Sequence, residues 1–178
     1  LQFALSIGLI MSAVQMNKQY QFALNYDIGF ETENIINIQV EGAYADLFEN
    51  DITSLPEVTE TSRYTMTMGT GGASIIVFQN ENSTEQTIAM ANNIDHRYLD
   101  MHNYEIIAGT GFLTPLPIGQ ESDKVIVNES LVEIMQLGTP EEAVGKTVSG
   151  RGQKYQIVGV VKDFVSVSLN VSGAEILQ

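Results

Sequence analysis

The sequence predicts an α+β fold in which one long apolar helix precedes a body of strands and short helices. Three observations indicate this class. The N-terminal stretch carries no charge, several later segments alternate apolar with polar residues and are rich in β-branched side chains, and helix-start signals stand between those segments. The length of 178 residues suits one domain, or two small domains that share a core.

Charge and composition exclude several classes of function. Lys and Arg together number 8 against 22 Asp and Glu, which gives a formal net charge of -14. A body this acidic repels phosphate backbones, so the sequence argues against nucleic-acid binding through a basic face. The chain has no Cys, which excludes a disulfide scaffold, a thiolate metal site and a cysteine nucleophile.

The N-terminal apolar segment predicts a helix that belongs to a membrane. Leu1 to Met16 is uncharged, and Lys18 carries the only charge before Asp27. As a helix, this run spans roughly 24 Å, which is short of the ~30 Å hydrocarbon core of a bilayer. We therefore expect residues 1–26 to be the end of a transmembrane helix, whose first turns lie upstream, together with a stalk.

Other kinds of apolar segment fit this stretch less well. A signal peptide would need a basic region before it and a clean cleavage site after it. An interfacial amphipathic helix would need Lys and Arg on its polar face. A buried core helix of a soluble domain remains an alternative.

Residues 27–70 predict a β-α-β unit. Gly29 is free to take a left-handed conformation where the N-terminal helix ends. Residues 34–40 alternate and are rich in Ile, which is typical of a strand, and 58–68 is a second strand by composition. Between them, 44–55 has apolar residues at helical spacing. We expect this helix to pack on one face of the sheet.

A β-rich second subdomain is expected at 71–122. It follows the glycine-rich break at 69–72. Residues 73–79 and 85–92 predict the two strands of a hairpin. A short helix over 95–103 follows, with Asp95 as its cap.

The α/β segment 123–178 gives the clearest signals. We expect a buried strand over 124–127, a helix over 130–136 capped by Asn128, and a short helix that starts at Pro140. The helix over 130–136 is expected to point Leu131, Ile134 and Met135 inward.

A second hairpin is expected near the end of this segment. Residues 146–148 and 155–162 are predicted to pair across the tight turn 149–153. No further element is predicted beyond this hairpin.

Seven short segments occur in a fixed order along residues 1–169. They are Gln2-Phe3, Lys18-Gln19, Asp27–Phe30, Asn34–Ile36, Val125–Glu129, Pro140–Lys146 and Ile157–Phe164. This series resembles the extracytoplasmic core domain of MacB/FtsX-type ABC transporter permeases, particularly the short forms of Bacteroidetes-like bacteria. Two departures stand out. Gly109 is followed by Thr110 where the family often has Arg, and the family usually continues well beyond the last segment, so 123–178 is expected to be truncated.

The resemblance implies a fold and a function. The fold is α+β: a porter-like β-α-β part with a β-rich subdomain inserted into it, preceded by the end of a transmembrane or stalk helix. The domain lies on the periplasmic side of a bacterial inner membrane and is not an enzyme. It couples ATP hydrolysis by a separate ATP-binding subunit to work on the far side of the membrane, a process called mechanotransmission. Implied partners are membrane lipid, a periplasmic adaptor, and peptide, drug or lipoprotein cargo.

No catalytic, cofactor-binding or metal site is expected. His96 and His102 are six residues apart, which on a helix is about 240° of rotation, so we expect two surface histidines rather than a metal pair. Glu141 and Glu142 follow the helix start at Pro140, where acids favour the first turn rather than catalysis.

The remaining candidates have structural interpretations. Asp163 is expected to make a turn bond and Phe164 to pack. Core packing is also expected of the methionines, which are Met66, Met68, Met90, Met101 and Met135. We expect one group of acids to form a solvated face, with binding of a cationic peptide as a second use. This acidic group is made up of Glu31, Glu33, Glu41, Asp46, Glu49 and Asp51.

Two other classes of function compete with the permease. A ligand-sensing ectodomain of a membrane receptor accommodates the N-terminal helix equally well, but it usually needs a deep pocket with converging polar groups. An exported hydrolase would need a nucleophile and a base in one cleft, and the sequence presents no such pattern, such as Gly-x-Ser-x-Gly.

Overall fold

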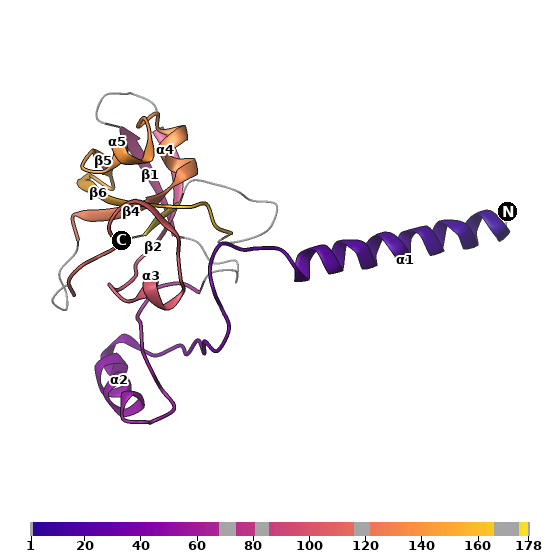
Figure 1. Cartoon of the computed structure of the whole chain (residues 1–178), viewed down its shortest axis with the longest axis horizontal. Coiled ribbons are helices and arrows are strands. Elements are labelled where there is room, and N and C mark those ends of the chain that lie inside the picture. Colours follow the sequence, from indigo (N-terminus) through magenta and orange to yellow (C-terminus); the bar gives the residue numbers. More distant parts are fainter. Residues whose placement is uncertain (1, 68–73, 81–85, 116–121, 166–174, 178) are drawn as a thin grey trace.

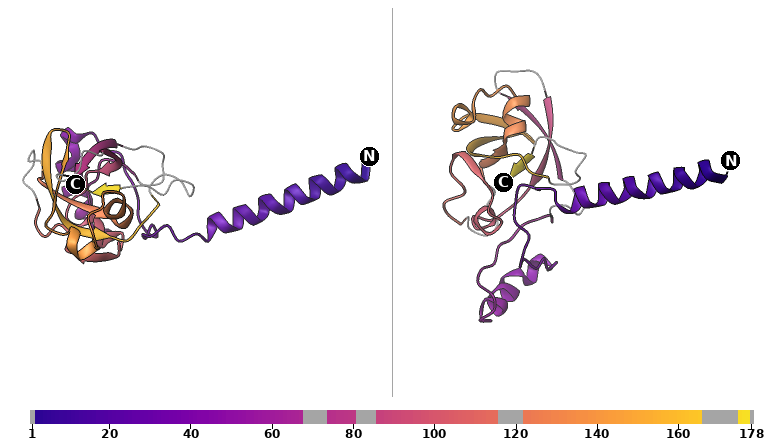
Figure 2. Two further views of the ribbon diagram at one scale, coloured as in Figure 1. Left: turned by 90° about the horizontal axis from the view of Figure 1, so that it is seen from above. Right: turned by 45° about the vertical axis from the view of Figure 1, so that its right-hand side comes forward.

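The computed structural model describes residues 2–67, 74–80, 86–115, 122–165 and 175–177. Helix α1, Gln2–Leu24, projects away from a body built of one sheet and short helices (Figure 1). Two further views agree that α1 lies apart from the body (Figure 2), and none of its residues is buried. The expected N-terminal helix is therefore confirmed, and its apolar side chains are exposed.

Seven strands form one mixed sheet in the described ranges. They are β1 Ser74–Asn80, β2 Gln86–Asn92, β3 Ile106–Gly109, β4 Lys124–Asn128, β5 Thr147–Gly150, β6 Gln153–Val161 and β7 Glu175–Leu177. Their order is β3-β6-β4-β7-β2-β1-β5, and β5 also pairs with β6, so the sheet closes on itself. The pairs β4–β6 and β2–β7 are parallel and the others are antiparallel. The α+β class is confirmed.

Strand β6 connects the most elements of the sheet. One of its edges pairs with β4 along residues 156–161. Its other edge pairs first with β5 and then with β3. Two glycines allow the close approach of β3: Gly109 has φ +73°, and a Cβ on Gly159 would collide with the carbonyl oxygen of Thr110. Any movement of β6 therefore reaches three neighbouring strands.

Short helices lie at or beyond both ends of the sheet (Figure 1). They are the 3-10 helix η1 Gly42–Tyr44, α2 Ala45–Thr53, α3 Tyr98–Met101, α4 Glu129–Ile134 and α5 Pro140–Ala143. Figure 1 shows α4 and α5 at one end of the sheet, α3 at the other end, and α2 beyond α3.

The caps of α4 and α5 follow from the sequence. Asn128 accepts a hydrogen bond from the Leu131 amide at 3.1 Å, and Thr139 forms a capping box with Glu142. Both predicted helix starts are confirmed. The predicted pairing of 146–148 with 155–162 is confirmed by β5 and β6.

The main core lies inside the closed sheet. Ile76 and Phe78 of β1, Ile157 of β6 and Leu131 of α4 are at most 2% exposed. Strand β4 is buried from Val125 to Asn128, on both faces. Such double burial explains why its sequence is continuously apolar rather than alternating.

A second, aromatic core lies on the other side of β4. It gathers Tyr98, Leu99, Tyr104, Ile126, Val161 and Phe164, with Phe30 and Tyr64 packed against it. Ile126 points to this cluster while Val125 and Val127 belong to the main core. The two cores therefore share β4 as their common wall.

The predicted strands 34–40 and 58–68 are not part of the sheet. Within the described residues, only an isolated bridge from Tyr64 to Ile94 forms. Composition favours a strand at 34–40, but a strand needs a partner, and none of the described segments pairs with it. The helix expected at 44–55 is confirmed within η1 and α2, but its expected packing on a face of the sheet was wrong, because α2 lies beyond α3 (Figure 1) and none of its residues is buried.

Three smaller expectations were wrong. Helix α3 begins three residues after Asp95, and its N-cap position is Arg97, whose amide donates to the Asp95 carboxylate at 3.1 Å. Ile134 is half exposed, because Leu131, Val132 and Met135 define the buried face of α4. Strand β7 was missed because three residues show no periodicity. The glycine-rich break at 69–72 lies outside the described residues.

Removing the Phe78 ring should destabilise the body strongly. The ring is fully buried, 6.0 Å from the Tyr155 ring, and its loss leaves a cavity. We expect Phe78→Ala to lower the free energy of unfolding by about 3–5 kcal/mol, measured by urea denaturation. The neighbouring Val77→Ala, at a side chain that is 46% exposed, should cost less than about 1 kcal/mol. Equal costs would contradict the assigned facing of β1.

Candidate functional site

The junction between α1 and the body is the most specific contact that the N-terminal region makes. The Ile28 carbonyl accepts a hydrogen bond from the Val165 amide at 2.9 Å. The Glu31 amide donates to the His102 carbonyl at 2.8 Å. Residues 28–31 are therefore held by two segments far away in the sequence, one after β6 and one after α3. We call residues 28–31 with these partners the junction.

Gly29 is required by the geometry of the junction. Its φ is +85°, and its amide donates to the Asp27 carboxylate at 2.9 Å. A Cβ at this position would lie 2.9 Å from the Asp163 carbonyl oxygen and 3.0 Å from the Phe164 Cα. The predicted left-handed conformation is confirmed, but it serves the junction, because α1 already ends at Leu24.

Phe30 inserts an aromatic ring into the second core. Its ring stacks on Tyr104 at 5.3 Å between centroids and meets the edge of Phe164 at 6.3 Å. Tyr104 and Phe164 also pack edge to face at 5.0 Å. Each such pair contributes about 0.5–1.5 kcal/mol beyond area burial. The expected packing role of Phe164, which is 6% exposed, is confirmed.

His102 was expected on the surface, and this expectation was wrong. Only 5% of the residue is exposed, and Nδ1 lies 2.8 Å from the Glu31 carbonyl oxygen. Because a carbonyl only accepts, the neutral ring carries its proton on Nδ1. Nε2 has no hydrogen-bond partner among the described residues. Helical spacing failed here because α3 ends at Met101, so the chain turns His102 inward, while His96 precedes the helix and is half-buried.

Asp163 links the junction to the main core. One carboxylate oxygen accepts from the Asn128 side chain at 2.8 Å and from the Ser130 amide at 2.9 Å. The other accepts from the Ser130 hydroxyl at 2.6 Å. The expected local turn bond is thus replaced by a clamp between the end of β6 and the start of α4. Gly29 packs directly against the backbone of this residue.

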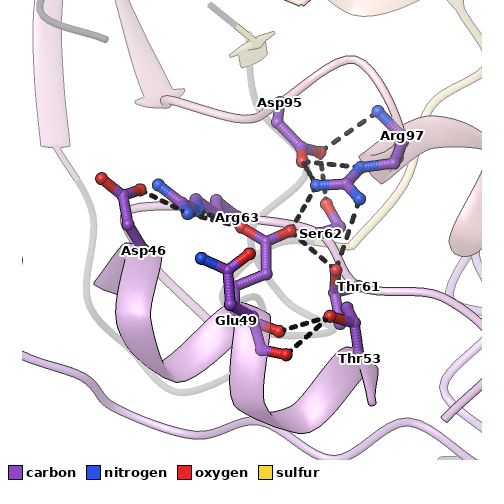
Figure 3. Close-up of polar contacts among 9 residues, drawn as sticks. Asp46, Glu49, Thr53, Thr61, Ser62, Arg63, Asp95 and Arg97 are labelled. Atoms are coloured by element: carbon purple, nitrogen blue, oxygen red, sulfur yellow. Dashed lines mark hydrogen bonds and ion pairs between the residues drawn. The ribbon is translucent and has the colours of Figure 1, made fainter. Parts of the chain in front are cut away.

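A cluster of charged residues joins α2 to the body (Figure 3). Glu49 of α2 is 2.8 Å from the Arg97 guanidinium, and its other oxygen accepts from Arg63 Nε at 2.8 Å. Arg63 also pairs with Asp46 at 2.7 Å, and Arg97 with Asp95 at 3.1 Å. Because α2 has no buried residue, these polar contacts largely determine where it sits.

The cluster changes the acidity of Glu49. Partial burial opposes ionisation of this carboxyl, but hydrogen bonds from Arg97, Thr61 and Arg63 outweigh it and lower the pKa of Glu49 to about 2. The expectation that the acidic group forms a solvated face was therefore wrong for Glu49, whose side chain is 21% exposed. Asp46 also departs from this expectation, because it pairs with Arg63. Glu33, Glu41 and Asp51 are exposed, as expected.

The other candidate residues have structural roles. Glu142 accepts from the Thr139 amide at 3.0 Å, which places it in the capping box of α5. Hydrogen bonds from its own backbone and from the Thr139 side chain lower the pKa of Glu141. Met135 is buried as expected. Partial burial is found for Met66, Met90 and Met101, and Met68 lies outside the described residues.

The described residues contain no group of three or more His, Asp or Glu side chains placed to hold a metal ion. None of the helices in the described ranges combines the length and the apolarity that crossing a bilayer requires.

Comparison with known proteins connects this arrangement to a family. The sequence model of the MacB-like periplasmic core domain matches residues 3–175. A comparison with curated proteins found no match.

Two solved structures are similar to parts of the chain. The extracellular domain of the noncanonic ABC-type transporter YknZ from Gram-positive bacteria is 20% identical, with a TM-score of 0.47 over 72% of this chain and 60% of that one. The periplasmic region of MacB from Actinobacillus actinomycetemcomitans is 16% identical, with a TM-score of 0.49 over 83% of this chain and 57% of that one. The chain thus spans less than two thirds of the length of these solved chains.

Glu49 should stabilise the position of α2 in a pH-dependent way. Since its folded-state pKa of about 2 lies below the ordinary value of 4.5, its contribution is present above pH 4.5 and is lost as the pH falls towards 2. Allowing for solvent screening, we expect about 1–2 kcal/mol. Glu49→Gln should speed hydrogen exchange of the α2 amides about 5–30-fold at pH 7, with no difference from wild type near pH 2. The exposed Glu33→Gln serves as control, and a pH-independent effect of Glu49→Gln would count against the ion pairs.

Substitution of Gly29 should loosen the junction. Ala at this position has an unfavourable φ and a Cβ against Asp163, so we expect a cost of about 1–3 kcal/mol. Hydrogen exchange of the Val165 and Glu31 amides should accelerate at least fivefold. Gly42→Ala is the matched control, because no atom lies within 4 Å of its added Cβ. Unchanged exchange at Val165 in Gly29→Ala would show that the contact is not needed.

Proposed function

Because the chain belongs to the family of MacB-like periplasmic core domains, we propose that it transmits mechanical work across a membrane for an ABC transporter permease. The sequence resemblance to this family is confirmed by the match over residues 3–175. In the proposed function, ATP is hydrolysed by a separate subunit on the cytoplasmic side, and this domain performs no catalysis. Its role is to move when the membrane helices move.

The observation that carries this proposal is the short, fixed connection between α1 and the body. Only residues 25–27 separate the end of α1 from Ile28, whose carbonyl is bonded to Val165. The Asn25 side chain returns to the Gln21 carbonyl at 2.7 Å, and Phe22 packs against Tyr26 at 5.4 Å. Helix α1 can therefore move only a short way before its displacement reaches the junction.

The junction offers two routes into the body. Backbone hydrogen bonds lead to the end of β6, which pairs with three strands. The Phe30 ring leads into the aromatic core that shares β4 with the main core. Both routes end on elements that are buried and closely packed, which move as units rather than deform.

We further propose the arrangement around this domain. Residues 1–26 form the end of a membrane helix and a stalk, 27–70 a porter-like part, 71–122 an inserted β-rich part and 123–178 the return segment. The body lies on the periplasmic side of a bacterial inner membrane. Membrane lipid surrounds the helix, the ATP-binding subunit is reached through the membrane part, and an adaptor with peptide, drug or lipoprotein cargo is engaged outside. The family match favours this assignment over a ligand-sensing ectodomain.

A flexible insertion should uncouple the domain. We expect six Gly and Ser residues inserted between Tyr26 and Asp27 to lower ATP-dependent export at least tenfold, because the helix can then move without pulling on the junction. The assay uses the full-length permease with its ATP-binding subunit and follows a macrolide or a secreted peptide, whichever the wild type exports. ATP hydrolysis should stay within about twofold of wild type.

The matched control carries the same insertion between Arg151 and Gly152, in the turn that joins β5 to β6. This position lies outside the proposed path, so export should stay near the wild-type rate. If export survives the insertion before Asp27, mechanical coupling through the junction is refuted.

A further inference from the structure

His102 is buried at the junction with one ring nitrogen unsatisfied. Only 5% of the residue is exposed, and Nδ1 donates to the Glu31 carbonyl at 2.8 Å. Nε2, on the other side of the ring, is enclosed by protein and has no hydrogen-bond partner among the described residues. Such atoms are rare in folded proteins, because burial without a hydrogen bond is costly. The mechanical coupling proposed above makes no use of this nitrogen.

The pocket around the His102 ring is aromatic. Ring centroids lie 4.4 Å away at Tyr98, 5.9 Å away at Phe30 and 6.3 Å away at Tyr104. Burial in this cluster raises the pKa of Tyr98 to about 12, so the pocket opposes a charged side chain. A neutral imidazole fits these surroundings, because its single N–H finds an acceptor in the Glu31 carbonyl.

No charged side chain is placed to compensate a second proton on the ring. The charged groups on the segments around His102 are exposed, and within the described residues none forms an ion pair with it. They are Asp27, Glu31, Asp100, Glu105, Glu129, Lys162 and Asp163. Arg97, at the N-cap of α3, is bound to carboxylates of its own cluster. The two tyrosines whose rings face His102 are phenols, which are uncharged between pH 5 and 8.

A second proton on Nε2 would therefore add a charged donor that has no acceptor where the ring lies. Attraction between a cation and the face of Tyr98 offsets only part of the hydration that the ring gives up. In water, histidine gains this proton between pH 8 and pH 5. The closed junction thus holds one proton fewer than an open junction, and its stability falls as the pH falls through this range.

Release of the His102 ring would loosen the N-terminal side of the junction. The ring donates to the Glu31 carbonyl, and the His102 carbonyl accepts from the Glu31 amide, so this residue holds Glu31 from two sides. The imidazole also meets the Phe30 ring edge to face. Movement of the imidazole into solvent breaks the bond to Glu31 and removes one wall of the site that Phe30 occupies.

We propose that His102 is a pH switch of the junction, which is closed while the ring is neutral and is opened by a second proton on Nε2. Opening lets α1 move without the body, so more ATP is hydrolysed for each exported molecule at acidic pH. Only this effect on export rests on the proposed function; the opening itself is a property of the fold.

The test measures hydrogen exchange of the Glu31 amide at pH 7.5 and pH 5.5, in the full-length permease with its ATP-binding subunit. Each rate is divided by that of an unstructured peptide at the same pH, which leaves the open fraction. Protection should fall about five- to tenfold, because uptake of one proton by an ordinary histidine shifts the equilibrium by about tenfold over this range. The α2 amides should keep their protection, since the Glu49 ion pairs persist above pH 4.5.

Two variants assign the change to one side chain. His102→Asn does not titrate and keeps an amide that can donate to the Glu31 carbonyl. Its smaller side chain lowers protection at both pH values, so the ratio between them is the readout, and it should lie within twofold of one. His96→Asn is the matched control, because His96 is the other histidine of the chain and lies half-buried before α3. This control should keep the wild-type ratio.

Constant protection of Glu31 in the wild type would overturn the switch. An equal fall in His102→Asn would overturn it as well, and so would loss of the fall in His96→Asn, which decides the matter even if His102→Asn does not assemble. At pH 5.5 the wild type should hydrolyse at least twice as much ATP per exported molecule as His102→Asn, and an equal ratio would overturn the effect on coupling. The insertion before Asp27 is assayed at pH 7.5, where the switch is closed, so failure of the proposed function leaves the exchange result standing.

Discussion

The structure depends on the insertion of Phe30 beside Tyr104 and Phe164, which the left-handed Gly29 makes possible. Gly29 allows the chain to pass against the Asp163 backbone, and the following ring enters the aromatic core. Without this insertion, the connection from α1 to the body would consist of backbone hydrogen bonds at Ile28 and Glu31. Those bonds are exposed to competition from water, whereas buried aromatic packing is not.

Two kinds of interaction hold the parts that surround the sheet. The junction is aromatic and tightly packed, with His102 buried beneath it. Helix α2, by contrast, is held through Glu49 and its arginine partners, without a buried residue of its own. Ion pairs at partly exposed sites are weak and depend on salt and pH, whereas apolar packing is not screened. The physical chemistry thus allows α2 to shift under conditions in which the junction stays closed.

The sequence predicted well those features that local signals determine. The cap at Asn128, the helix start at Pro140, the buried strand at 124–127 and the hairpin of β5 and β6 are local, and each was confirmed. Features that depend on distant partners were missed. The segment 34–40 has the composition of a strand without a described partner. The burial of His102 depends on where α3 ends, and the hydrogen bonds of Asp163 depend on what lies beside β6. Hydrophobic periodicity carries neither kind of information.

A distance measurement between α1 and the body tests the central claim most directly. Spin labels at Gln21→Cys on α1 and Glu133→Cys on α4 would report their separation in the full-length transporter, with and without ATP. Both positions are exposed. A rigid junction predicts one narrow distance distribution that is the same in both nucleotide states, because helix and body move as one unit. A broad distribution, or one that changes with ATP, would contradict the account.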